Sequence, residues 1–209
     1  MSCRPVVVLA AIVALVAGCD TGDGRTLRPP PPGVTAPTST TVADASASSA
    51  AALGTTPGSS GLMLTSPEFV DGGQLPAQYA ACGGDNVSPP LQWSGVPAEA
   101  VELAIVVDDP DAPDGQFLHW VVAGLSPSLI GLGPGVVPEE AVEARNDTSE
   151  FGWFGPCPPD GETHRYVFTL YALSQATGVA EGAGGPEALQ AITSRPGVAA
   201  TLSVTYAVP

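Results

Sequence analysis

The residues of this chain that could do chemistry are concentrated in two short segments, "DDPDAPDGQFLHW" at 108–120 and "ETHRY" at 162–166. The first segment holds four carboxylates, and each segment holds one of the chain's two histidines. Imidazoles and carboxylates together can bind an anion, hold a divalent metal ion, or act as general acid and base. The simplest alternative is a solvated, proline-rich turn beside a core histidine.

The first segment follows an apolar run whose alternation predicts a β-strand. The core-facing row of this predicted strand consists of Val101, Leu103, Ile105 and Val107. Glu102 and Asp108 then lie on the opposite face. One further step of the same period places Asp109 at the end of the core-facing row, because side chains two apart in a strand share a face.

Two more predicted strands begin with a polar residue on an apolar row. In the segment 118–125, His119 shares a face with Val121 and Ala123. In the segment 165–173, the row of Phe168 and Leu170 extends back to Tyr166 and His164. If these strand ends meet, a small polar pocket caps a hydrophobic core, which is a common construction for ligand sites. The residues predicted to form it are Asp109, His119, His164 and Tyr166.

The remaining elements predict the fold class. Short β-rich runs lie at 62–66, 91–96 and 200–208, and the long connections are rich in Gly and Pro. Only the segment 185–195 has a helical pattern, with Pro186 suited to its first turn. We therefore expect a mainly β protein, an antiparallel β-sandwich with one or two small peripheral helices.

The charge balance limits the partners. The chain has 21 acidic and 6 basic residues, contains no lysine, and carries a formal charge of −15. Three residues of each sign precede Gly61, so the segment 61–209 keeps the whole charge of −15. Such a surface repels nucleic acid and anionic lipid headgroups, so no nucleic-acid partner is expected. Any anion must be captured locally, against the overall field.

The N-terminal region indicates export and a lipid anchor. An apolar run at 6–16 ends in "VAGC" and is too short to span a bilayer comfortably. It resembles a bacterial lipoprotein signal peptide of residues 1–18, which implies lipidation of Cys19 by acyl chains such as palmitate. The alternative is an ordinary signal peptide. Localisation would then be at the bacterial cell membrane, with the domain on the extracytoplasmic side.

The segment 19–60 is rich in Pro, Thr, Ser and Ala, and it predicts a disordered tether. The segment 61–209 is long enough for one domain with a real core. Its two cysteines, Cys82 and Cys157, form an even pair that an exported domain could join as a disulfide. Two free, half-buried thiols are the alternative.

Several motifs together resemble the phosphatidylethanolamine-binding protein family, which includes Raf kinase inhibitor protein and the plant flowering-time regulators. These motifs are "DPDAP" at 109–113, "HW" at 119–120 and "GPCPPDGETHRYVF" at 155–168. The motifs "NVSPPLQWSGVP" at 86–97 and "RND" at 145–147 are similar to the bacterial, Raf-kinase-inhibitor-like branch. The resemblance covers residues 64–206, nearly the whole predicted domain.

The resemblance implies a β-sandwich with a small pocket at one end for phosphate-like anions and phosphoethanolamine headgroups. By resemblance, Asp109, His119, His164 and Tyr166 line this pocket. The "GPxPP" loop forms its rim, which adds Gly155, Pro156 and Pro159 to the candidate residues. Asp111 and Pro113 are expected to hold the neighbouring loop together. The family requires no metal, and no cofactor is expected.

The leading hypothesis is a non-catalytic, membrane-anchored module that binds a small anion or a phospholipid headgroup through protonated histidines. Asp109 would orient one histidine and raise its pKa. A protein-interaction module that inhibits a protease or kinase is the alternative, and no partner is identified. A divalent-metal site of two His and one Asp is a further alternative, although no HxH or HExxH spacing occurs. An enzyme is not expected, because no GxSxG motif and no nucleophile beside a base is present.

Overall fold

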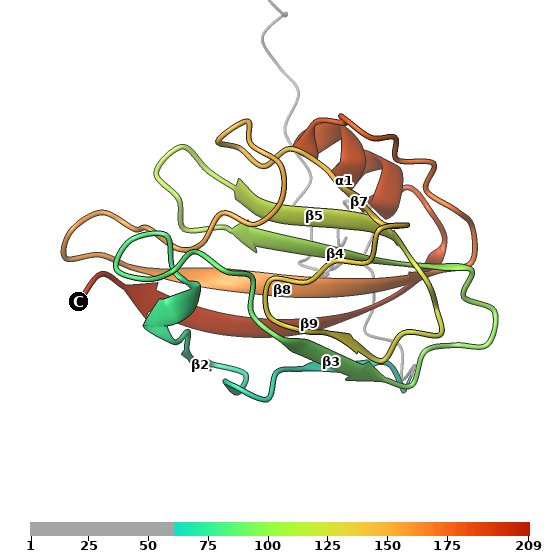
Figure 1. Ribbon diagram of the computed structural model, residues 1–209, viewed down its shortest axis with the longest axis horizontal. Helices are drawn as coiled ribbons and strands as arrows, with labels where there is room; N and C mark the ends of the chain where they lie inside the picture. The colour runs from blue at the N-terminus through green and yellow to red at the C-terminus, as the bar shows by residue number, and fades with distance from the viewer. Residues whose placement is uncertain (1–60) are drawn as a thin grey trace, which may run out of the picture. The chain divides into compact units, whose positions relative to one another are not determined.

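We analysed a computed structural model of the protein, which describes residues 61–209. The predictions of a signal peptide, a lipidated Cys19 and a tether therefore lie outside the described residues. Within them, no helix is long and apolar enough to cross a membrane. The described part is mainly β, as the sequence predicts (Figure 1).

Two sheets form the described part of the chain. The large sheet has six strands in the order β2-β9-β8-β4-β5-β7, and the small one has the order β1-β3-β6. The long strands of the large sheet are β4 (Glu102–Asp109), β5 (Phe117–Leu125), β8 (Thr163–Leu173) and β9 (Gly197–Ala207). Its short edge strands are β2 (Gly73–Gln74) and β7 (Val142–Glu143). The small sheet comprises β1 (Met63–Thr65), β3 (Leu91–Ser94) and β6 (Gly131–Leu132).

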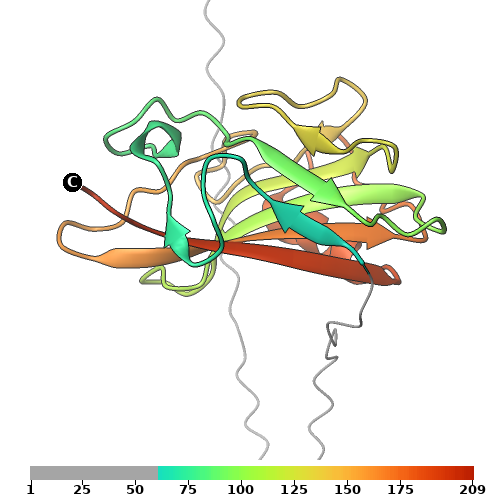
Figure 2. The same cartoon turned by 90° about the horizontal axis from the view of Figure 1, so that it is seen from below.

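All strand pairs are antiparallel except one. The exception is the pairing of β2 with β9, which is parallel. The predicted antiparallel β-sandwich is confirmed, with one parallel pair at this edge, where a two-residue strand left no recognisable alternation in the sequence. Figure 2 shows the small sheet, with β1 and β3, lying across one face of the long strands.

The main core lies between the two sheets. Leu64, Leu91 and Trp93 of the small sheet pack in one cluster with the inward rows of β4, β5, β8 and β9. The opposite face of the large sheet carries a second cluster beneath the helix α1 (Gly185–Thr193). Pro186 lies in the first turn of this helix, as predicted, and a 3-10 helix, Ala77–Tyr79, is the second small helical element.

The predicted row of β4 is correct except at its beginning. Leu103, Ile105 and Val107 are buried in the main core, but Val101 precedes the strand and is 56% exposed. Glu102, predicted to lie with Asp108 on the face opposite this row, is buried there. Its carboxylate accepts hydrogen bonds from the Gly124 amide and from the amide and hydroxyl of Thr177. Because α1 covers the second face of β4, both faces of this strand are buried. Its alternation therefore does not distinguish core-facing from solvent-facing residues.

Candidate functional site

A cavity of about 280 Å³ lies at the end of β4 and at the beginning of β5 and β8. Asp109, His119, His164 and Tyr166 all line it, so the structure brings together the four residues that strand periodicity placed in one pocket. The remaining lining residues come from the loop after β4, from the start of β5, and from the loop before β8: Ala112, Pro113, Asp114, Phe117, Phe154, Cys157 and Pro159.

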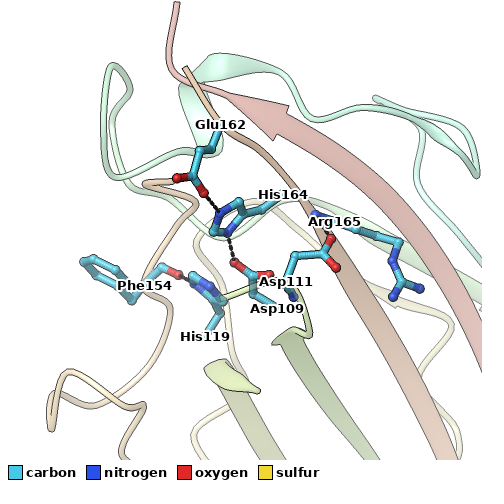
Figure 3. A network of polar contacts seen from close by, with 7 residues as sticks. All are labelled: Asp109, Asp111, His119, Phe154, Glu162, His164 and Arg165. Carbon is cyan, nitrogen blue, oxygen red and sulfur yellow. Dashed lines mark hydrogen bonds and ion pairs between the residues drawn. The ribbon is translucent and has the colours of Figure 1, made fainter. Parts of the chain in front are cut away.

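Asp109 ends β4 inside the protein, and its side chain is 4% exposed. One carboxylate oxygen, Oδ1, accepts a hydrogen bond of 2.8 Å from the Asp111 amide. The other, Oδ2, lies 2.7 Å from Nδ1 of His164 (Figure 3). The turn amide fixes the carboxylate, and the carboxylate in turn fixes the imidazole ring.

Asp111 holds the loop together, as predicted. Its Oδ2 accepts a hydrogen bond of 2.9 Å from the Arg165 amide, which ties the loop after β4 to the adjacent strand β8. Asp111 does not line the cavity, whereas Pro113 does. Pro113 is therefore part of the wall as well as part of the loop.

His164 lies between two carboxylates. Its Nδ1 contacts Asp109, and its Nε2 lies 3.2 Å from Oε2 of Glu162. Burial by itself would lower the pKa of His164, but the hydrogen bonds and negative charges of Asp109 and Glu162 together raise that pKa above its ordinary value. This shift favours the imidazolium form of the ring, which donates a hydrogen bond on each side.

His119 owes its orientation to a β-bulge. In the β4–β5 ladder, Val107 pairs with Trp120 and Asp108 pairs with Leu118, so His119 has no partner. The prediction that His119 shares a face with Val121 and Ala123 is therefore wrong. Those two residues pack beneath α1, while His119 turns to the cavity and stacks 5.9 Å from the Phe154 ring.

The protonation of His119 differs from that of His164. Its Nδ1 lies 2.6 Å from the Phe154 carbonyl oxygen. A carbonyl can only accept, so Nδ1 carries the proton. Burial lowers the pKa of His119 and outweighs the opposing effect of this hydrogen bond. At neutral pH the ring is neutral, and Nε2 is an acceptor.

Tyr166 closes the inner end of the cavity. It is 1% exposed, and its ring meets the His119 ring edge-on at 5.1 Å. Burial, the charge of Asp109 and a hydrogen bond to Asp109 raise the pKa of the Tyr166 phenol. The phenol therefore stays neutral and serves as a hydrogen-bond donor.

The "GPCPP" loop contributes to the cavity only in part. Cys157 and Pro159 line it, but Gly155 and Pro156, predicted as rim residues, are buried and do not. The Gly155 amide donates to Oδ1 of Asn86 at 2.7 Å, and the Pro156 carbonyl accepts from Ala81 and Cys82. These two residues therefore anchor the loop.

The two cysteines of the domain are joined. Cys82 and Cys157 form a disulfide, with their Cα atoms 4.9 Å apart. The disulfide ties the cavity-lining loop to the segment that follows Ala77–Tyr79. Of the alternatives that the sequence left open, the structure has the bridge and not the free thiols.

The sequence alone did not identify some residues of the site. Phe117, Phe154, Asp114 and Glu162 all lie in or beside the cavity. The side-chain pattern did not identify Phe154, which contacts His119 through its carbonyl oxygen as well as through its ring. Glu162 did carry a signal, since it lies two residues before His164 at the beginning of a predicted strand, where side chains two apart share a face.

The geometry does not favour the metal alternative. In residues 61–209, no group of three or more His, Cys, Asp or Glu side chains is placed to hold a metal ion. The physical reason is that His119 and His164 do not present free nitrogens to a common point with Asp109. Both Nδ1 atoms and the second nitrogen of His164 already bond protein oxygens.

The fold and the cavity define a β-sandwich binding protein with a small polar pocket at one end. The family model described as phosphatidylethanolamine-binding protein matches residues 65–207. The chain belongs to this family.

Curated relatives support the same assignment. A Mycobacterium tuberculosis protein named "Putative lipoprotein LppC" is 42% identical over 199 residues, which is 95% of this chain and 92% of the relative. A UPF0098 protein from Methanothermobacter thermautotrophicus is 42% identical over 134 residues, covering 62% of this chain and 87% of the relative.

Two solved structures are similar. A homolog of the family from Chlamydia trachomatis is 39% identical with a TM-score of 0.64, and the match covers 69% of this chain and 96% of that one. Escherichia coli YbcL, titled a new member of the mammalian family, is 31% identical with a TM-score of 0.67. That match covers 71% of this chain and 99% of YbcL.

Proposed function

We propose that the cavity binds a small phosphate-like anion, without catalysis, through the imidazolium of His164. The observation that carries this proposal is that His164, a buried histidine that lines the cavity, already contacts an anionic oxygen of Glu162 through its Nε2. Asp109 keeps the ring oriented from the other side. A donor fixed in this way makes a charge-assisted hydrogen bond with little further ordering.

The neutral His119 favours an anion that brings its own proton. Nε2 of His119 can accept a hydrogen bond, while Nε2 of His164 can donate one. A monoprotonated phosphate can satisfy both, by donating its P–OH to the first ring and accepting from the second. A fully ionised anion would place a lone pair against the lone pair of His119.

The size of the cavity and the charge of its lining limit the class of ligand further. The cavity of about 280 Å³ accommodates a phosphoryl group with a short substituent and is too small for two acyl chains. The carboxylate of Asp114 also lines it. A zwitterion such as phosphoethanolamine, whose ammonium group could approach this carboxylate, therefore fits better than a ligand with several negative charges.

Binding without chemistry is the proposal that the contacts support. Among residues 61–209, neither histidine is hydrogen-bonded to a Ser, Thr or Cys side chain that could act as a nucleophile. Cys157, which lines the cavity, is committed to its disulfide. The site therefore offers hydrogen-bond donors and acceptors, but no group placed to form a covalent intermediate.

The test is calorimetric titration of the full chain with inorganic phosphate and with phosphoethanolamine, at pH 6 in a phosphate-free buffer. We expect heat from both ligands in the wild type and none in His164→Ala. Heat of equal size in His164→Ala would place the binding elsewhere. Absence of heat in the wild type with both ligands would refute the proposal.

We also propose that the chain is anchored to a bacterial membrane through a lipidated Cys19, with the domain outside the cytoplasm. The support is the lipoprotein-like N-terminal sequence and the similarity, over 95% of this chain, to a relative that is named a lipoprotein. Expression of Cys19→Ser should release the protein from the membrane fraction. Retention of that variant in the membrane, at the wild-type level, would contradict a lipid anchor at this residue.

A further inference from the structure

Glu162 ends a tight turn and contacts His164, which lines the cavity. The amide of Glu162 donates to the Pro159 carbonyl at 3.0 Å, and Gly161 has a φ of +83°. This pattern is that of a turn whose third residue needs a positive φ, which glycine adopts without strain. The turn directs the Glu162 carboxylate back to Nε2 of His164 instead of into solvent (Figure 3).

The two carboxylates on His164 differ in how firmly they are held. The Asp109 side chain is 4% exposed, lies 2.7 Å from Nδ1, and is also bound by the Asp111 amide. The Glu162 side chain is 57% exposed and lies 3.2 Å from Nε2, and no other hydrogen bond to it is found within residues 61–209. This contact is expected to contribute little free energy, because water competes for the exposed Glu162 carboxylate.

The Glu162 carboxylate also resembles the proposed ligand chemically. It is an anionic oxygen placed on Nε2 of His164, the ring nitrogen that is not bonded to Asp109, and His164 lines the cavity. A phosphate oxygen and the Glu162 oxygen cannot both bond the single proton on Nε2 with good geometry. The negative charges of the phosphate and of the Glu162 carboxylate, both next to Nε2, would also repel each other.

We propose that Glu162 is a built-in competitor, an internal carboxylate ligand that an incoming anion must displace from Nε2 of His164. This inference rests on the proposed function of the same site, and it makes Glu162 the residue that determines how strongly plain anions are accepted. The firmly held Asp109 stays in place, while the exposed Glu162 side chain swings away. The position of Glu162, at the end of a tight turn, lets it move without disturbing β8.

The test compares Glu162→Gln and Glu162→Ala with the wild type, using calorimetric titration of the full chain with inorganic phosphate at pH 6. We expect both variants to bind phosphate about three- to tenfold more tightly, because a weak ion pair and a nearby like charge are removed. Asp160→Asn is the matched control. It removes one exposed carboxylate from the same turn without touching His164, so it should change the affinity less than about twofold.

A second readout is independent of any ligand. Nuclear magnetic resonance titration of the His164 ring should give a lower pKa in both Glu162 variants than in the wild type, and no change in Asp160→Asn. The other charged or titratable groups near this ring stay the same in all four proteins, so the difference reports Glu162 alone. These groups are Asp109, Asp111, Asp114, His119, Arg165 and Tyr166.

The outcomes separate this inference from the proposed function. Equal or weaker phosphate binding in the Glu162 variants, with normal binding in the wild type, would overturn the competitor and leave the anion pocket standing. Absence of phosphate binding in the wild type and in both variants would overturn both. Binding in the variants but not in the wild type would support Glu162 as a competitor and would overturn anion binding by the native protein. An unchanged His164 pKa in the variants would overturn the Glu162–His164 pair itself.

Discussion

At the scale of single residues, His119 and His164 share one cavity and differ in charge. His164 is flanked by Asp109 and Glu162, which raise its pKa, whereas burial lowers the pKa of His119. These opposite shifts favour a charged donor in His164 and a neutral acceptor in His119. In the proposed anion site, this asymmetry would distinguish anions by their protonation.

The first prediction concerns that distinction. At pH 7, phosphate should bind about tenfold or more tightly than sulfate, because only phosphate carries a proton to donate to Nε2 of His119. His119→Ala should weaken phosphate binding and bring the two affinities within about twofold of each other. Calorimetric titration with both anions measures this, and equal affinities in the wild type would contradict a neutral His119 that accepts from the ligand.

The second prediction is a pH dependence of stability that originates in His164. Its pKa in the folded protein lies above the ordinary value of 6.5. The folded state therefore holds this proton more tightly than the unfolded state. The resulting stability is fully present below pH 6.5 and is lost as the pH rises through the raised pKa.

Urea unfolding of the wild type and of His164→Asn, in a phosphate-free buffer, isolates this contribution. The wild type should exceed the variant by about 1–2 kcal/mol more at pH 6 than at pH 9, on the scale of one charge-assisted hydrogen bond. Subtraction of the variant removes the opposite contribution of His119, whose lowered pKa costs stability in acid. A difference that is constant between the two pH values would mean that His164 is not charged in the folded protein.

At the scale of elements, the regular strands could be predicted and the irregular ones could not. β8 is paired with β9 over eleven residues without interruption, so a period of two placed His164 and Tyr166 correctly beside Phe168 and Leu170. In β5 the bulge at His119 breaks the period, and the face assigned to that histidine was wrong although its place in the cavity was right. A bulge leaves no mark in the alternation, because it depends on the pairing with β4.

Loops were the other limit of prediction. The family motif marked the "GPCPP" segment as important, but it could not show which of its residues line the cavity and which anchor the loop. Whether a residue of this segment lines the cavity or anchors the loop depends on contacts with a part of the chain that is distant in sequence. The hydrogen bond from Gly155 to Asn86, for example, joins residues 69 positions apart. Such pairings between distant loops follow no local period, and only the folded chain brings them together.

The third prediction tests this anchor. A Cβ on Gly155 would lie 2.3 Å from the Tyr79 carbonyl oxygen and 2.6 Å from the Ala81 amide nitrogen, both of them backbone atoms that cannot move aside independently. Gly155→Ala should therefore lower the free energy of unfolding by about 2–3 kcal/mol and shift the Phe154 carbonyl away from His119. Urea unfolding measures the first effect, and phosphate affinity reports the second.

Gly133→Ala is the control for this substitution. A Cβ there meets only the Val136 side chain, at 3.9 Å, an ordinary contact. The change in unfolding free energy should stay within about 0.5 kcal/mol. If Gly155→Ala were equally harmless, the "GPCPP" loop would not be pressed against the chain around Tyr79.

At the scale of the whole molecule, the net negative charge of the protein opposes the proposed binding of an anion in the cavity. The chain has a formal charge of −15, all of which falls within residues 61–209, and Asp109, Asp114 and Glu162 lie at the cavity itself. Long-range attraction therefore cannot account for anion binding. The proposed affinity depends on exact placement of His164, and so on the elements that hold the cavity wall.

The disulfide is the covalent part of that wall, and its removal is the fourth prediction. Cys82 and Cys157 are 75 residues apart in sequence, so the bridge restricts a long loop in the unfolded chain, an effect of about 4 kcal/mol in the chain-entropy model. The double variant Cys82→Ala/Cys157→Ala should lose about this much stability in urea. It should also bind phosphate more weakly, because Cys157 and Pro159 line the cavity. Wild type unfolded in the presence of a thiol reductant should match the variant. A variant as stable as the oxidised wild type would show that the hydrogen bonds from Ala81 and Cys82 to Pro156 hold the loop without the bridge.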